Sequence, residues 1–215
     1  PRDLPGSLYN AMIHPFVGFP LKGVIWYQGE SNAWMGKSYA DLFKRMILSW
    51  RERWNSKFTF LFVQLANHEA GENWAELRES QCKALSLPMT GMAVAIDIGE
   101  ALDIHPRNKQ DVGARLALAA RSVAYVEELN HSGPIYKSMA AEGKAIRVLF
   151  DHVCGGLTCK GGELKGFTIA GADRVFHAAE AKIDGDSLIV RSPKVARPLA
   201  VRYAWRSNPA CNLSN

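Results

Sequence analysis

Hydrophobic positions in the first 131 residues form short strand-like runs that alternate with segments of helical spacing. Three runs have the length and the β-branched or aromatic character of buried strands: 23–28, 58–64 and 91–98. Apolar residues three and four positions apart predict helices in the intervening and following segments: about 37–54, 73–86 and from 108 onward. Strands that alternate with helices indicate parallel βαβ units, with helices on both faces of one sheet.

Residues that can cap a helix stand near the start of each predicted helix. A polar residue followed by an acidic residue three positions later can satisfy the free backbone N–H groups of a first turn. The candidate pairs are Ser38 and Asp41, Asn73 and Glu76, and Asn108 and Asp111. These pairs support the three helix positions, and Pro88 closes the second helix.

The pattern changes near residues 130–134, where Asn, His, Ser, Gly and Pro follow one another. Beyond this break, short β-type runs are separated by Gly-Gly, Gly-Asp and Ser-Pro turns: 145–151, 164–170, 187–190 and 199–205. Such runs, without helical periodicity, predict antiparallel strands. We therefore expect an α/β domain at residues 1–131 and a β-rich C-terminal domain at residues 132–215.

Composition and charge narrow the class of protein. The 215 residues are 47% hydrophobic and 22% charged, which is typical of a folded globular chain and not of a disordered or fibrous one. No apolar run approaches the ~18 residues of a membrane helix. The net charge of +5 comes entirely from residues 132–215, with 12 Lys and Arg against 7 Asp and Glu. These charges are scattered, so we predict a solvated β surface and no nucleic-acid partner.

Cysteine spacing and nucleotide-binding motifs give no sign of a cofactor. Cys82 falls on a predicted helix, where a core position is expected, while Cys154 and Cys159 could close a small loop in an exported protein. The spacing of Cys, His and acidic residues does not suit a zinc site. Phosphate-loop and dinucleotide fingerprints are missing after the first strand.

Polar residues gather where the three predicted strands end. They are Gln28, Glu30 and Asn32 after the first strand, Gln64, Asn67 and His68 after the second, and Asp97, Asp103 and His105 after the third. Because ligands bind beyond the carboxyl ends of parallel strands, these residues should converge on one edge. A histidine beside a carboxylate can act as a general base, and an amide can stabilise an oxyanion, so hydrolytic chemistry is indicated.

Other interpretations of these residues remain open. Glu30 with Asp97 or Asp103 could form the two-carboxylate pair of a glycoside hydrolase. Trp34, in the turn after Glu30, could face a sugar in a non-catalytic carbohydrate-binding protein. His68 could be an ordinary surface loop residue.

Three longer strings carry a resemblance to a known family. Residues 8–15 (Leu-Tyr-Asn-Ala-Met-Ile-His-Pro), 22–32 (Lys-Gly-Val-Ile-Trp-Tyr-Gln-Gly-Glu-Ser-Asn) and 103–109 (Asp-Ile-His-Pro-Arg-Asn-Lys) resemble the sialate O-acetylesterase family of SGNH-type carbohydrate esterases. The similarity continues through residues 166–171 and 201–205. The resemblance implies a three-layer α/β/α parallel-sheet fold, SGNH or flavodoxin-like, followed by a small β-rich region.

The resemblance also implies a serine esterase that removes acetyl groups from sugar hydroxyls, typically those of sialic acid. His105 would be the general base, Asp103 would orient it, and Gln28 would contact the oxyanion or the substrate. Glu30 and Asn32 would shape the pocket. No metal or organic cofactor is expected, because an activated serine and hydrogen-bond donors suffice for ester cleavage.

The chain departs from the family pattern in two places. The superfamily usually places its aspartate three residues before the histidine, where this chain has Leu102, so Asp97 is a second candidate for orienting His105. The Gly-Gln-Ser-Asn stretch that holds the family's nucleophile does not occur, and Ser31 is a weak substitute. We therefore expect a C-terminal portion that needs the serine-bearing remainder of the same protein, in a secreted, periplasmic or lysosome-like compartment.

Overall fold

A parallel three-stranded sheet forms the centre of the first half of the chain. The computed structural model describes residues 4–69, 71 and 73–215. The sheet has the order β1-β2-β3, with β1 at Gly23–Trp26, β2 at Thr59–Gln64 and β3 at Thr90–Val94. Both neighbours of β2 run parallel to it, with Val24 opposite Phe60 and Phe62 opposite Met92. The parallel prediction is therefore confirmed.

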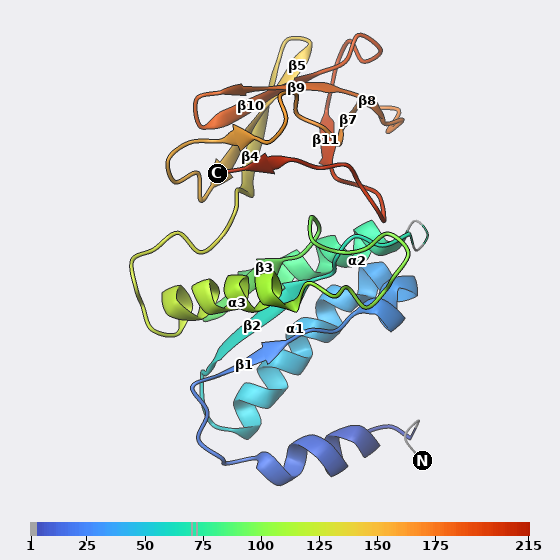
Figure 1. Cartoon of the computed structure of the whole chain (residues 1–215). Helices are drawn as coiled ribbons and strands as arrows, with labels where there is room; N and C mark the ends of the chain where they lie inside the picture. Colours follow the sequence, from blue (N-terminus) through green and yellow to red (C-terminus); the bar gives the residue numbers. More distant parts are fainter. Residues whose placement is uncertain (1–3, 70, 72) are drawn as a thin grey trace.

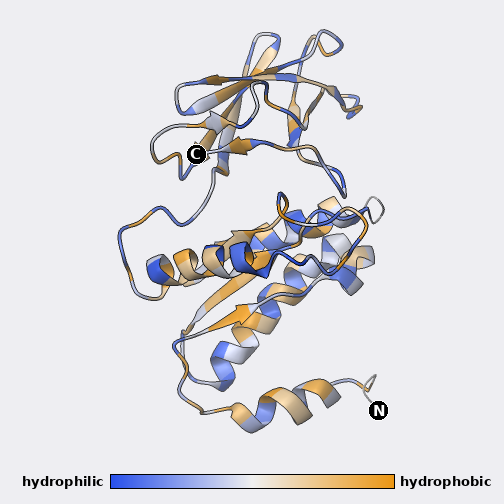
Figure 2. Ribbon diagram, viewed as in Figure 1, coloured by the Kyte–Doolittle hydropathy of each residue, from blue (hydrophilic) through white to orange (hydrophobic). Residues whose placement is uncertain are grey.

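Helices cover both faces of this sheet (Figure 1). They are α1 at Gly36–Arg53, α2 at Asn73–Cys82 and α3 at Lys109–Val123. Phe60 and Phe62 of β2 pack with α1 and α2, whereas Val63 packs with Val112 of α3 on the other face. All six residues of β2 are buried, which explains the continuous apolar run in the sequence. Figure 2 shows the hydrophobic colouring of these strands.

The boundaries of several predicted elements shift, most clearly at the ends of the first strand, the third strand and the second helix. The first strand ends at Trp26 and the third at Val94, so the polar residues that follow belong to loops. The second helix ends at Cys82 and continues as a 3-10 turn, Lys83–Ser86. In the described part of the chain, no helix is long and apolar enough to cross a lipid bilayer.

The capping predictions have different outcomes. The Asn108 side chain accepts a hydrogen bond from the Asp111 backbone N–H at 3.1 Å, which confirms the cap of α3. The cap at Ser38 is wrong, because α1 begins at Gly36 and the Ser38 hydroxyl donates to the Met35 carbonyl. A Cβ atom at position 36 would lie 2.9 Å from the Glu76 side chain, so α2 packs closely against the first residue of α1 and favours glycine there.

The β-rich half has small antiparallel sheets and, over residues 124–215, no helix. The first sheet has the order β4-β5-β10-β9, formed by Ile135–Glu142, Ala145–Asp151, Ser187–Arg191 and Glu180–Asp184. The second has the order β11-β7-β8, formed by Ala200–Tyr203, Phe167–Ala170 and His177–Ala178. A two-stranded ladder pairs β12, Leu213–Ser214, with β6, Thr158–Cys159. Strand β4 was not predicted, because seven of its eight residues are exposed and its sequence does not alternate between apolar and polar residues.

The cysteines form no disulfide: Cys82, Cys154, Cys159 and Cys211 are all free. The loop between Cys154 and Cys159 is thus not bridged, although the sequence allowed a bridge. The Cys159 sulfur instead accepts a hydrogen bond from the Asn212 side chain at 3.2 Å. Cys82 packs against the larger core cluster, as predicted.

A buried arginine joins the two halves of the chain. Arg78 on α2 is only 3% exposed, and its guanidinium donates to the backbone carbonyls of Ala204, Arg206 and Ser207. Burial lowers the pKa of Arg78 to about 10, so the group stays charged at neutral pH. The backbone N–H of His68 adds a bond to the Ser207 carbonyl at 3.2 Å. Residues 204–207 are therefore fastened to α2 and to the loop after β2.

Replacing Arg78 should weaken the whole structure. Arg78→Ala leaves buried carbonyls without donors, and we expect the free energy of unfolding to fall by about 3 kcal/mol. Urea denaturation followed by circular dichroism measures this change. Arg121→Ala is the matched control, because that exposed side chain pairs with Glu127 on the surface and its removal should lower the free energy of unfolding far less. Equal losses in the two variants would contradict the assigned role.

Candidate active site at the carboxyl edge of the sheet

The carboxyl ends of all three parallel strands lie at one edge of the sheet. The loop after β3, residues 95–108, lies at this edge (green in Figure 1). It is joined to the loop after β2, since the Gly99 N–H donates to Asn67 Oδ1 at 2.8 Å and the Glu69 N–H donates to the Ala101 carbonyl at 2.8 Å. The loops that carry the predicted site residues are therefore connected to each other.

One contact joins the segment that follows His105 to the end of the first strand. Ile104, Trp26 and Tyr27 all pack against the larger core cluster. The Lys109 ammonium lies 4.8 Å from the centre of the Tyr27 ring. Since Tyr27 directly precedes Gln28, the turn after β1 and the segment 103–109 are neighbours at this edge.

His105 and Asp103 are close but not hydrogen-bonded through their side chains. Asp103 Oδ1 accepts the backbone N–H of His105 at 2.9 Å, and it lies 4.0 Å from His105 Nδ1. The two-residue spacing suits this backbone bond, which fixes the turn. The His105 side chain is 90% exposed, so the imidazole is free to meet another group.

The Gln28 amide, in contrast, is held at both ends. Its Oε1 accepts from the Tyr39 hydroxyl at 3.0 Å, and its Nε2 donates to Asn32 Oδ1 at 2.6 Å. Burial raises the pKa of Tyr39, so the phenol keeps the proton that it donates. The Gln28 backbone carbonyl accepts from Gln81 Nε2 at 3.1 Å. One N–H of the Gln28 amide is thus left for a further acceptor.

The backbone between Gln28 and α1 turns sharply. Gly29 has φ of +151°, and a Cβ there would lie 3.1 Å from the side chains of Gln81 and Leu77, so this position needs glycine. A 3-10 turn, η3 at Glu30–Met35, follows. This turn places Glu30 near Tyr27 and Tyr39, where its charge adds to the effect of burial in raising both tyrosine pKa values.

Asp97 is engaged elsewhere. Both of its carboxylate oxygens accept from the Arg115 guanidinium, at 2.6 and 2.8 Å, and Arg115 also donates to the Val94 carbonyl. Burial by itself would raise the pKa of Asp97, but Arg115 lowers it overall. A low pKa does not suit the general acid of a glycoside hydrolase, and the bidentate pair does not suit the orienting of His105. Asp97 therefore fastens α3 to the end of β3.

The residues that end β2 also have structural partners. Gln64 Nε2 donates to the Arg78 carbonyl and to the Cys82 sulfur, inside the protein. Asn67 bonds the Asn208 side chain at 2.9 Å. His68 is partly buried with its ring 5.6 Å from that of Trp74, so the expectation of a simple surface residue is wrong. The second strand end thus serves the junction with the β-rich half.

Tyr39 and Gln81, which hold Gln28, were missed by the sequence analysis. Tyr39 lies on α1 and Gln81 on α2, and residue type and helical spacing do not indicate that either side chain hydrogen-bonds to Gln28. Only the packing of α1 and α2 against the turn after β1 reveals their role.

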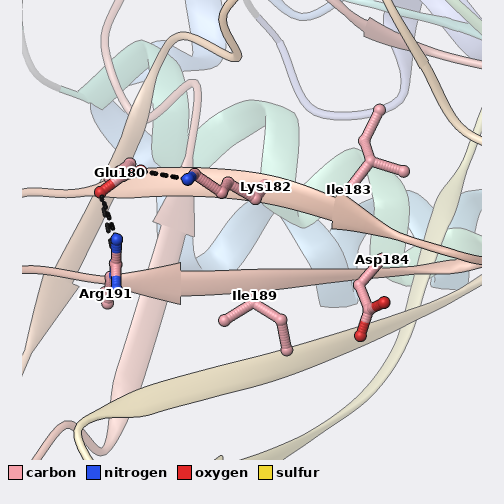
Figure 3. A pocket seen from close by; sticks show the side chains of 6 residues that line it. All are labelled: Glu180, Lys182, Ile183, Asp184, Ile189 and Arg191. Atoms are coloured by element: carbon pink, nitrogen blue, oxygen red, sulfur yellow. Dashed lines mark hydrogen bonds and ion pairs between the residues drawn. The ribbon is translucent and has the colours of Figure 1, made fainter.

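A surface depression elsewhere does not qualify as a second active site. A pocket of about 290 Å³ lies on β9 and β10 of the β-rich half, and Figure 3 shows its lining. Glu180 pairs there with Lys182 and Arg191, and Asp184 pairs with Arg147. Across residues 4–69, 71 and 73–215, acidic, histidine and cysteine side chains form no cluster able to hold a metal ion.

Comparison with known proteins gives a consistent family. The family profile described as carbohydrate esterase, sialic acid-specific acetylesterase, matches residues 4–122. Sialate O-acetylesterase of Rattus norvegicus is 37% identical over 171 residues, which are 67% of this chain and 32% of that protein. The Mus musculus protein of the same name is 39% identical over 156 residues, covering 61% of this chain and 29% of that protein.

A solved structure extends the likeness to the β-rich half. A carbohydrate acetylesterase from Xanthomonas citri is 53% identical, with a TM-score of 0.93 over 97% of this chain and 51% of that one. The chain thus spans about half of this solved protein and about a third of the curated relatives. The profile covers more than half of the chain, and the chain therefore belongs to the sialic acid-specific acetylesterase family of carbohydrate esterases.

Proposed function

We propose that the chain supplies the base and the amide donor of a carbohydrate O-acetylesterase, which removes acetyl groups from sialic acid or related acetylated sugars. The observation that carries this proposal is a contact at one sheet edge between Lys109, in the segment 103–109 that holds Asp103 and His105, and Tyr27, which directly precedes Gln28. Family membership supports the ester chemistry.

The proposed mechanism is acyl transfer through a serine. His105 takes the proton of a serine hydroxyl while the serine oxygen attacks the acetyl carbonyl carbon. The Gln28 N–H donates to the developing oxyanion, and Asp103 orients the imidazole. His105 then gives the proton to the departing sugar oxygen. Water, activated by the same histidine, releases acetate and restores the serine.

The serine is proposed to come from outside these 215 residues. The outer edge of β1 has no partner strand among the described residues, and Ile25 on this strand is 69% exposed. Further apolar side chains are exposed on the segment before β1: Leu8, Met12, Phe16 and Phe19. An additional strand beside β1 would cover this surface and would end near Gln28. Ser31, in η3, is the alternative nucleophile within the chain.

A second candidate function is sugar binding without catalysis. It is favoured by Trp34, whose side chain is 75% exposed in η3, where a pyranose ring could stack. Release of acetate from an acetylated sugar distinguishes the two functions, because a binding protein produces none.

The His105 prediction is made for the chain joined to a serine-bearing upstream segment. His105→Ala should lower kcat for acetate release by roughly 10²- to 10⁴-fold, the contribution of a general base. His177→Ala, on β8, is the control and should leave the rate unchanged. An active His105→Ala enzyme would remove this residue from the mechanism.

In the same protein, Ser31→Ala should leave the rate of acetate release unchanged. Loss of activity in that variant would place the nucleophile within this chain.

The Gln28 prediction tests the oxyanion contact in the same protein. Gln28→Ala should lower kcat roughly tenfold to a thousandfold, as expected for losing one oxyanion donor. Tyr39→Phe should give a smaller loss of about fivefold, because it removes one hydrogen bond that orients the Gln28 amide. Gln110→Ala, an exposed glutamine on α3, is the control. Unchanged kcat in Gln28→Ala would rule out the contact.

A further inference from the structure

Arg202 stands out among the charged residues of the β-rich half because aromatic rings hold it. Its guanidinium carbon lies 4.0 Å from the centre of the Phe176 ring and 4.5 Å from that of Trp205. Arg202 is on β11, Phe176 directly precedes β8, and Trp205 lies two residues beyond the end of β11. Stacking of this kind covers the faces of a guanidinium and limits its rotation.

The N–H groups of Arg202 have no acceptor within the part of the chain that the structure describes. The other arginines on described strands of this half are paired: Arg147 with Glu142 and Asp184, and Arg191 with Glu180. The cross-strand neighbours of Arg202 are Thr168 and, one strand further, Ala178, so neither supplies a carboxylate. Arg202 is therefore a fixed, partly exposed cation whose in-plane donors are free.

The position of this group relates it to the proposed site. Trp205 is followed by Arg206 and Ser207, whose carbonyls accept from Arg78 of α2, and Ser207 also binds the His68 backbone. His68 belongs to the loop after β2, at the carboxyl edge of the sheet. The aromatic-bound arginine thus lies on the strand end that docks beside this edge.

We propose that Arg202, with Phe176 and Trp205, binds the carboxylate of an acidic sugar. A guanidinium presents two parallel N–H groups that match the two oxygens of a carboxylate, and aromatic rings pack against the C–H faces of a pyranose. This inference rests on the proposed function and deepens it: Arg202 is the residue of the β-rich half that determines specificity for a negatively charged substrate.

The test measures binding by the 215-residue chain and needs no catalysis. The probes are the methyl α-glycoside of N-acetylneuraminic acid and the methyl ester of its carboxyl group, which differ only in that charge. In NMR titrations we expect the acid to bind at least about tenfold more tightly than the ester, as for one lost charge-assisted contact. Arg202→Gln should abolish this preference, and Arg202→Lys should retain part of it, because lysine keeps the charge without the fork.

Arg191→Gln is the matched control, since it removes a strand arginine that already has a carboxylate partner. It should keep the preference for the acid. Equal binding of acid and ester by the unaltered chain, binding of neither, or an unchanged preference in Arg202→Gln would each overturn the proposal. If Arg202→Gln does not fold, as judged by its melting curve, the acid and ester comparison in the unaltered chain and in Arg202→Lys decides.

The outcome is separable from that of the esterase proposal. In the chain joined to the serine-bearing upstream segment, acetate release from 4-nitrophenyl acetate, which carries no carboxylate, depends on His105 and should be unaffected by Arg202→Gln. Loss of the acid preference with retained esterase activity would overturn the carboxylate site alone.

Discussion

The burial of strand β2 on both faces is the constraint on which the rest of the structure depends. A run such as Phe60–Leu61–Phe62–Val63 has apolar side chains on both sides, so it needs a layer of helix on each face and a strand on each edge. Helical connections make the neighbouring strands parallel, which brings every strand's carboxyl end to the same edge. Residues far apart in the sequence, such as Gln28 and His105, are thereby brought to a common edge by core packing alone.

Polar groups at this edge divide into those that build it and those that are left available. Arg78 donates hydrogen bonds to three backbone carbonyls of the β-rich half. Both carboxylate oxygens of Asp97 accept from Arg115, and the Gln64 side chain donates to the Arg78 carbonyl inside the protein. Satisfying these groups fixes the loops, because an unpaired buried donor or acceptor is costly. Gln28 keeps one free N–H, and His105 keeps its whole imidazole.

Rigidity is distributed unevenly over the proposed catalytic groups. The Gln28 amide is oriented by Tyr39 and Asn32, as suits a donor that must already point at a developing charge. His105 is exposed and touches Asp103 only through its backbone. The aromatic-bound Arg202 on the other half would add recognition of the substrate's charge.

The sequence alone determined the order of the parallel strands and helices in the first half, the capping of α3 by Asn108 and the family, because these depend on local patterns of residue type. It proposed Gln28, Asp103 and His105 from strand-end positions and from the resemblance. Only the tertiary structure decided that Asp97 is held by Arg115, that Gln64 and His68 serve the core and the junction, and that Tyr39 holds Gln28. A residue's type fixes what it can bond, but its partner comes from a distant part of the chain, and packing alone selects it.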